Sequence, residues 1–260
     1  MLSAKVQEQV KEIIRECVVK KLESYSPETQ HMPFHSRLIG QDRMALFSFI
    51  HSLNTSFGTK IFEPIAHLIA ETNFRAIREY EVGTQISSQA QIVIQDILNE
   101  LSMKATAPDK CADIKRIRSV CQSGKMKSLK PVRADLFLEN QSGSVYLCDI
   151  KTAKSNIGGF KDIKRTLLDW VAIYLLKNPE ADIHSFAGIP YNPYEPKPYQ
   201  RWTLQSTIDI EHELKVAEEF WNFIGCGDIY VDLLDCFRVE GVELNLEINN
   251  RFRSLSLSMF

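Results

Sequence analysis

The sequence predicts a single α/β domain that is preceded by an N-terminal helical extension. Two short runs with strand periodicity, residues 134–138 and 144–151, are joined by the turn sequence Asn140-Gln-Ser-Gly143, which is typical of a hairpin. An amphipathic stretch from Phe160 and a buried apolar run from Ile183 to Ile189 follow. This order of strand, strand, helix and strand favours a right-handed helical crossover onto the same sheet.

The N-terminal region is predicted to be helical. Apolar residues recur on one face between Ser3 and Leu22, as in a helix that packs on its own core or on a partner. A second helix is expected from about Gln41 to Leu53, with a turn at residues 54–56. Its expected buried positions are Met44, Phe47 and either Ile50 or His51. A helical stretch from Gly58 to Glu71 follows, with Pro64 in its first turn.

The middle of the chain is predicted to alternate helices with less regular segments. Residues 88–101 form an expected helix with Ile92, Ile94, Ile97 and Leu101 facing inward. The Lys-rich segment from Lys104 to Lys130 is interpreted as a connector that is mobile or contacts DNA. A strong helical stripe then comprises Phe160, Ile163, Leu167, Val171 and Tyr174, and Asn178-Pro179 closes it. The Pro-rich and aromatic block from Tyr191 to Trp202 is expected to be an extended loop.

The C-terminal region is expected to complete the sheet domain. A helix is predicted from Glu211 to Phe223, a short helix or strand from Ile229 to Phe237, and an alternating strand from Val242 to Ile248. No internal repeat or long linker separates these elements. We therefore expect one domain over residues 1–260, with a helical extension in 1–53 that can serve in dimerisation, a core in 54–205, and a completing segment in 206–260.

Composition limits the class of protein. With 260 residues, of which 44% are apolar, the chain can bury a full core. Its six cysteines show no Cys-x-x-Cys pair, which favours reduced thiols in a cytoplasmic protein without structural zinc. His31 and His35 are expected at the surface. No signal peptide or apolar run of membrane length is present, so we expect a soluble protein.

Basic residues gather around the predicted hairpin although the net charge is −2. Between Lys125 and Arg165 the chain carries nine Lys or Arg residues and four Asp or Glu residues. Such a run can be a solvated face or a site for a polyanion such as DNA.

The hairpin brings two carboxylates and a lysine together. If Gly143 supplies a positive φ in a short turn, Asn140 pairs with Ser144, and the same register sets Asp135 opposite Asp149. Alternation along the second strand turns Lys151 to the same face. Opposed like charges destabilise a sheet, so a cation between them is expected. That cation can be Lys151 itself, in a simple salt-bridged surface hairpin, or a magnesium ion held by hard oxygen ligands.

These residues also carry a resemblance to a known group of enzymes. Ala134-Asp135 followed by Asp149-Ile150-Lys151 resembles the PD-(D/E)xK nuclease signature, with Ala134 where Pro is usual. The blocks from Ile150 to Trp170 and from Tyr191 to Trp202 resemble type II restriction endonucleases of the TdeIII and MjaII kind. The segment from Ser56 to Glu63 fits them too.

The resemblance implies a restriction-endonuclease-like α/β fold, with a mixed central sheet flanked by helices, and magnesium-dependent hydrolysis of DNA phosphodiesters. Carried over by position, Asp135 and Asp149 bind the metal, Lys151 is the basic residue of the motif, and Glu63 completes the metal site. Glu71 is the second choice for that third carboxylate.

The expected DNA contacts lie beyond the hairpin. Lys154, Asn156, Lys164 and Arg165 are candidates for phosphate contacts, although Lys164 and Arg165 can equally form the solvated face of their helix. Lys197 and Arg201 are candidates for contacts with bases. Cleavage of both strands of a palindrome, such as a site of the GGNCC type, implies a homodimer. The alternatives are a structure-specific repair or recombination nuclease of the same fold, and a non-catalytic DNA-binding module.

Overall fold

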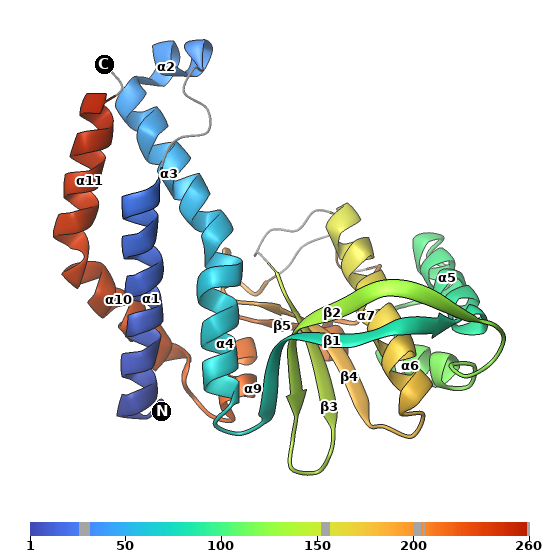
Figure 1. The fold of residues 1–260 in the computed structure, drawn as a ribbon. Coiled ribbons are helices and arrows are strands. Elements are labelled where there is room, and N and C mark those ends of the chain that lie inside the picture. Colours follow the sequence, from blue (N-terminus) through green and yellow to red (C-terminus); the bar gives the residue numbers. More distant parts are fainter. Residues whose placement is uncertain (26–31, 152–156, 200–203, 205, 259–260) are drawn as a thin grey trace. The chain divides into compact units, whose positions relative to one another are not determined.

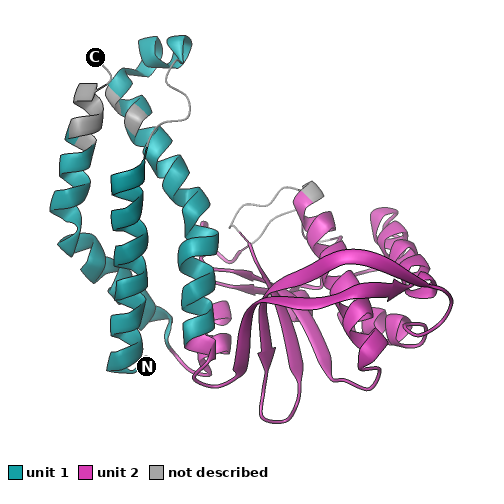
Figure 2. Cartoon of the chain, in the orientation of Figure 1, with its two compact units in different colours: residues 1–68, 229–260 teal, residues 69–228 magenta. Residues whose placement is uncertain are grey.

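The computed structural model describes residues 1–25, 32–151, 157–199, 204 and 206–258. The chain forms two compact units (Figures 1 and 2). The helical unit comprises residues 1–68 and 229–260, and the sheet unit comprises residues 69–228. The unit boundaries therefore fall after residues 68 and 228, whereas the sequence suggested divisions after residues 53 and 205.

The helical unit contains α1 (Ala4–Ser24), α2 (Pro33–Ile39), α3 (Gln41–Phe57), the π-helix η1 (Gly58–Phe62), most of α4 (Glu63–Ala70), α10 (Tyr230–Glu243) and α11 (Asn245–Ser258). Helix α1 confirms the prediction. The Ser3 hydroxyl caps its first turn, and its apolar stripe is buried. The stripe packs against α10, and the Arg15 side chain donates two hydrogen bonds, of 3.0 and 3.1 Å, to buried Glu240. Residues from both ends of the chain thus build one unit.

Three predictions for the helical unit were wrong. The expected turn at residues 54–56 is absent, because α3 continues through Phe57 into η1. In α3, Met44 and Phe49 are buried, whereas Phe47 and Ile50 are exposed, as is His51. The expected strand Val242–Ile248 is instead the end of α10 and the start of α11. Alternating apolar residues over a segment as short as 242–248 are compatible with a strand and also with a helix that is mostly exposed.

The sheet unit contains a mixed sheet of five strands, which confirms the predicted fold class. In spatial order these are β1 (Arg75–Ser87), β2 (Met126–Glu139), β3 (Val145–Ile150), β4 (Ile183–Ile189) and β5 (Leu214–Val216). β1, β2 and β3 pair antiparallel, whereas β3, β4 and β5 pair parallel. Helix α7 (Ile157–Lys177) connects β3 to the neighbouring parallel strand β4. The crossover onto the same sheet is thus confirmed, and β4 has the bounds that the sequence predicts.

Side chains of alternating direction cover both faces of this sheet. On one face, Leu147 joins the large apolar core with Leu167 of α7, beside α5 (Ser88–Ser102) and α6 (Lys110–Arg118). On the other face, Tyr146 and Phe186 pack against Phe223 of α9 (Glu218–Gly225), with ring centroids 5.2 and 5.5 Å apart. Burial on both faces holds β3 and β4 in the middle of the unit.

Other elements of the sheet unit were not predicted. β1 was missed, because charged residues interrupt it and most of its residues are at least partly exposed. The segment 104–130 holds α6 and the start of β2 rather than a connector alone. The predicted helix Glu211–Phe223 is divided into α8 (Ile210–Glu213), β5 and α9. In α5, Ile92 is 52% exposed, and Ala90 takes the buried position instead. None of the described helices is long and apolar enough to cross a membrane.

Candidate active site

The hairpin of β2 and β3 has the predicted turn and register. The Asn140 amide donates to the Ser144 carbonyl at 3.1 Å, and Gly143 has a φ of +84°, a conformation that glycine adopts without strain. The Asn140 side chain accepts hydrogen bonds from the amides of Ser142 and Ser144. The ladder pairs Leu136 with Cys148, so the next pair in the same register is Asp135 and Asp149.

The two carboxylates and Lys151 lie together at the end of this ladder. The Ile150 amide donates to Oδ2 of Asp135 at 2.8 Å, and Nζ of Lys151 lies 2.8 Å from Oδ1 of Asp149. Asp149 is only 4% exposed, whereas the Lys151 side chain is 42% exposed. The cluster is therefore buried on the side of Asp149 and open to solvent on the side of Lys151.

The electrostatics of the cluster favour a further cation. Burial raises the pKa of Asp149 to about 6, the nearby Lys151 ammonium opposes this rise, and the adjacent Asp135 adds to it. Oδ2 of Asp149 is buried and has no hydrogen-bond partner among the described residues, which is costly for a charged oxygen. The neighbouring Cys148 is not a candidate nucleophile, because burial raises its thiol pKa well above the ordinary value.

Strand β4 fixes the end of β3 that carries these groups. Asp149 is paired with Ala187, and the Lys151 amide donates to the Gly188 carbonyl at 3.0 Å. A Cβ on Gly188 would lie 2.5 Å from Cε2 of Phe220 in α9. The small residue therefore lets β4 and α9 pack closely behind the cluster.

The other two predicted metal ligands, Glu63 and Glu71, lie at the two ends of α4. Glu63 begins α4 in the helical unit and is 8% exposed, and its role stays a prediction. Glu71 is an exposed residue just after α4, in the sheet unit. Among the described residues, no group of three or more His, Cys, Asp or Glu side chains is arranged to hold a metal ion. The cluster thus offers two carboxylates.

The predicted DNA contacts divide into three groups. Lys154, Asn156 and Arg201 lie outside the described residues. Arg165 is exposed and donates to Oε1 of Gln95 at 2.7 Å. Lys197 is also exposed, in the loop after β4.

Lys164 requires a correction. Its side chain has no exposed surface, and its ammonium donates to Asp113 and Glu213 at 2.7 Å each. A buried ammonium with two carboxylate partners presents no charge to a phosphate, so Lys164 leaves the set of candidate DNA contacts.

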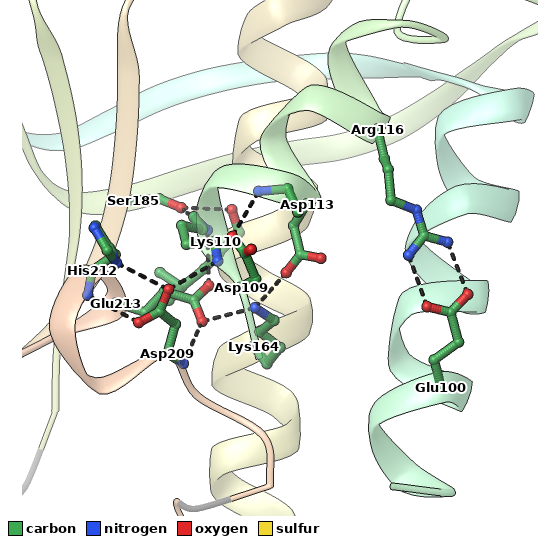
Figure 3. A network of polar contacts seen from close by, with 12 residues as sticks. Glu100, Asp109, Lys110, Asp113, Arg116, Lys164, Ser185, Asp209, His212 and Glu213 are labelled. Atoms are coloured by element: carbon green, nitrogen blue, oxygen red, sulfur yellow. Dashed lines mark hydrogen bonds and ion pairs between the residues drawn. The ribbon is translucent and has the colours of Figure 1, made fainter. Parts of the chain in front are cut away.

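Lys164 is part of a buried ionic network that the sequence did not reveal (Figure 3). Lys110 of α6 lies 3.0 Å from Glu213 and donates to Ser185 of β4 at 2.7 Å. Burial alone would raise the pKa of Glu213, but Lys110 and Lys164 outweigh it and hold that pKa below its usual value. We call Lys110, Asp113, Lys164 and Glu213 the buried ionic network. It joins α6 and α7 to the segment before β5.

Asp209 extends this network to the surface. Its carboxylate accepts from the Lys110 amide at 2.9 Å and lies 3.0 Å from Nδ1 of His212. Figure 3 also shows a separate pair, in which Arg116 of α6 donates to Glu100 of α5 at 2.8 and 2.9 Å. No local signal in the sequence marks the buried network, because its four ionic residues come from three distant segments.

Comparison with known proteins identifies the family. A model of the family described as type II restriction endonuclease, HinfI, matches residues 2–241. The chain belongs to this family. Type II restriction enzyme HgiCII of Herpetosiphon aurantiacus is 27% identical over 236 residues, which cover 88% of this chain and 85% of HgiCII. HgiEI of the same organism is also 27% identical, over 88% of this chain and 84% of the relative.

A more distant relative agrees with the resemblance seen in the motif blocks. Type II restriction enzyme MjaII of Methanocaldococcus jannaschii is 25% identical over 193 residues, which cover 70% of this chain and half of MjaII. As a member of the HinfI family, the chain is a type II restriction endonuclease, whose substrate is DNA.

Proposed function

We propose that the protein cleaves both strands of DNA by magnesium-dependent hydrolysis at a short palindromic site, for which a GGNCC-like sequence is the first candidate. The observation that carries this proposal is the cluster of Asp135, Asp149 and Lys151. Two carboxylates oppose each other, one of them has a buried oxygen without a partner in the described residues, and a half-exposed ammonium lies beside it.

The donor set fits magnesium. This ion prefers oxygen ligands, keeps several water molecules, and is commonly held by one or two carboxylates together with substrate phosphate. Asp135 and Asp149 would supply those carboxylates, and Glu63 is proposed as a third on the resemblance alone. A divalent cation beside Asp149 would also favour its ionised form against the burial that raises its pKa.

The residues of the cluster have separate roles in the proposed reaction. When bound, magnesium would supply a Lewis acid for a non-bridging phosphate oxygen and would acidify water. Asp135 and Asp149 would hold the ion, and the pairing of Asp149 with Ala187 fixes the strand that carries it. The Lys151 ammonium lies on the open side, where it would orient the attacking water and offset the negative charge that develops on the phosphoryl oxygens.

DNA binding is proposed to involve exposed basic residues of the sheet unit. Arg165 and Lys197 support this proposal by their exposure, and Lys154, Asn156 and Arg201 are proposed from the resemblance. Two active sites are needed to cut both strands of a palindrome, so we propose a homodimer, with the helical unit as the candidate dimerisation element. All six cysteines are free thiols, in keeping with a proposed cytoplasmic location.

Digestion of one plasmid of known sequence in magnesium tests the proposal. Discrete fragments whose sequenced ends share one palindrome are expected. Random nicks, or an intact linear duplex beside cleaved branched DNA, would instead support the structure-specific nuclease. Retained DNA binding without any cleavage would support the non-catalytic module.

A paired substitution tests the role of Lys151. Lys151→Ala should lower the cleavage rate by about 10²–10⁴-fold and leave DNA binding in calcium largely intact. Lys177→Ala removes the same charge at the exposed end of α7 and should leave the rate unchanged. Equal rates for the two variants would remove Lys151 from the mechanism.

A further inference from the structure

Strand β2 is much longer than its pairing with β3. It runs from Met126 to Glu139, but β3 pairs only with Leu136 to Glu139. The earlier part of β2 is paired with β1 alone, and the two strands continue together as a ribbon (Figure 1). We define this ribbon as residues 81–87 of β1 and 126–133 of β2. It belongs to the same strand that carries Asp135.

The β2 side of the ribbon is basic and accessible, whereas its β1 side packs on the core through Val82 and Ile86. Lys127, Lys130 and Arg133 are exposed, and Lys125 precedes them in the chain as another exposed residue. None of these four forms an ion pair within the part of the chain that the structure describes. Several exposed cations on a two-stranded ribbon suit a polyanion.

Strand β1 places no acidic residue opposite Lys127, which lies toward the outer end of the ribbon. Lys127 is paired with Ile86, and the next pair along is Ser128 with Gln85. Only Arg133, near the base of the ribbon, is paired with an acidic residue, Glu81. The positive charge therefore dominates toward the outer end of the ribbon.

The base of the ribbon is bent and anchored. Between the pairs Gly83–Val132 and Gln85–Ser128, β1 advances by two residues and β2 by four, so a bulge in β2 includes Pro131, which has no amide hydrogen to donate. A Cβ on Gly83 would lie 2.7 Å from Cγ2 of Ile173 in α7. This close approach fixes the ribbon against the same helix that packs beside the active-site strands.

The spacing of the charges matches flanking DNA. At a rise of about 3.3 Å per residue, Lys130 lies at most about 16 Å and Lys127 at most about 26 Å along the strand from Asp135. Successive base pairs rise by about 3.4 Å. The two lysines therefore reach phosphates up to about five and eight base pairs from the bond that is cut.

We propose that this ribbon is a DNA-binding arm whose Lys127 and Lys130 bind backbone phosphates that flank the recognition site. The inference rests on the proposed function, because it takes Asp135 to mark the scissile phosphate. The rival explanation is structural: lysines on an exposed strand discourage pairing with other chains. In that case, replacing the two lysines would not change the difference in affinity between duplexes with long and short flanks.

The test compares duplexes with flanks of about ten or about two base pairs, lengths chosen from the rises above. Their central sequence is the palindrome identified by plasmid digestion, or GGNCC where digestion yields none. Binding is measured in calcium as a function of salt. The double variant Lys127→Ala/Lys130→Ala is compared with Lys115→Ala/Lys177→Ala, which removes two exposed charges from α6 and α7. All four positions are exposed, so folding should be preserved.

The wild-type protein and the control variant should bind the long duplex more tightly than the short one. The ribbon variant should bind both duplexes equally, and the slope of log K against log salt on the long duplex should fall by about 2, since each phosphate contact contributes about 0.9. An unchanged flank preference and salt slope would overturn the inference. Absence of magnesium-dependent cleavage with a normal flank effect would refute the proposed function and leave the arm standing.

Discussion

Substitution of Lys164 by Met tests whether the buried ionic network stabilises the sheet unit. Lys164 has no exposed surface and donates to both Asp113 and Glu213 at 2.7 Å. Methionine fills similar space but removes the charge. The two carboxylates would then share Lys110, which lies 3.0 Å from Glu213.

The expected cost follows from this geometry. Loss of one partner from a buried ion pair costs about 3–5 kcal/mol, because the remaining charge is buried without compensation. Burial already raises the pKa of Asp113, against the attraction of Lys164. Without Lys164 this pKa should rise further, so the variant gains stability as the pH falls and Asp113 is protonated. The loss should therefore be larger at pH 8 than at pH 5.

Urea unfolding followed by tryptophan fluorescence measures this loss. Trp170 and Trp221 are buried in the sheet unit, so their emission reports on the unit that contains the network. Arg116→Met is the matched control, since its pair with Glu100 is partly exposed and should contribute no more than about 1 kcal/mol. Equal losses for Lys164→Met and Arg116→Met would mean that the buried ionic network contributes no more than a partly exposed ion pair.

Three further predictions concern other parts of the sheet unit. Burial raises the pKa of Asp169 to about 6. Because this folded-state pKa lies above that of the unfolded chain, the wild type loses stability as the pH rises from about 4 to 6. In thermal unfolding, Asp169→Asn should therefore raise the free energy of unfolding by about 1–2 kcal/mol at pH 8 and leave it unchanged at pH 4. Gly188→Ala should cost about 1–3 kcal/mol in urea unfolding, because the added Cβ would lie 2.5 Å from the fully buried Phe220 ring. Removal of divalent metal with a chelator should abolish cleavage, and magnesium should restore it; a rate that chelation leaves unchanged would contradict metal dependence.

Local sequence patterns were enough to predict the hairpin that carries the candidate site. The turn at Asn140 to Gly143 fixes the register by its length, and that register places Asp135 against Asp149 whatever surrounds it. The apolar stripe of α7 was equally clear, because its helical period continues over several turns.

The features that were missed depend on distant parts of the chain. A lysine is rarely buried unless it is paired, and the partners of Lys164 come from α6 and from the segment before β5. Its position in a basic stretch therefore suggested a DNA contact, whereas the folded chain uses it inside the network. β1 was missed because its edge position leaves charged residues such as Arg75 and Glu81 in solvent, which hides the apolar alternation of a strand.

The single-turnover cleavage rate of Asp149→Asn in magnesium shows whether the cluster is the catalytic metal site. Asparagine keeps the size of the side chain but removes the charge that the cluster offers to a metal. We predict a rate at least about 10²–10³-fold below that of the wild type, with DNA binding retained. The folded state should be no less stable than that of the wild type, since burial disfavours the Asp149 charge. A variant that folds, binds DNA and cleaves within a few-fold of the wild-type rate would contradict this prediction.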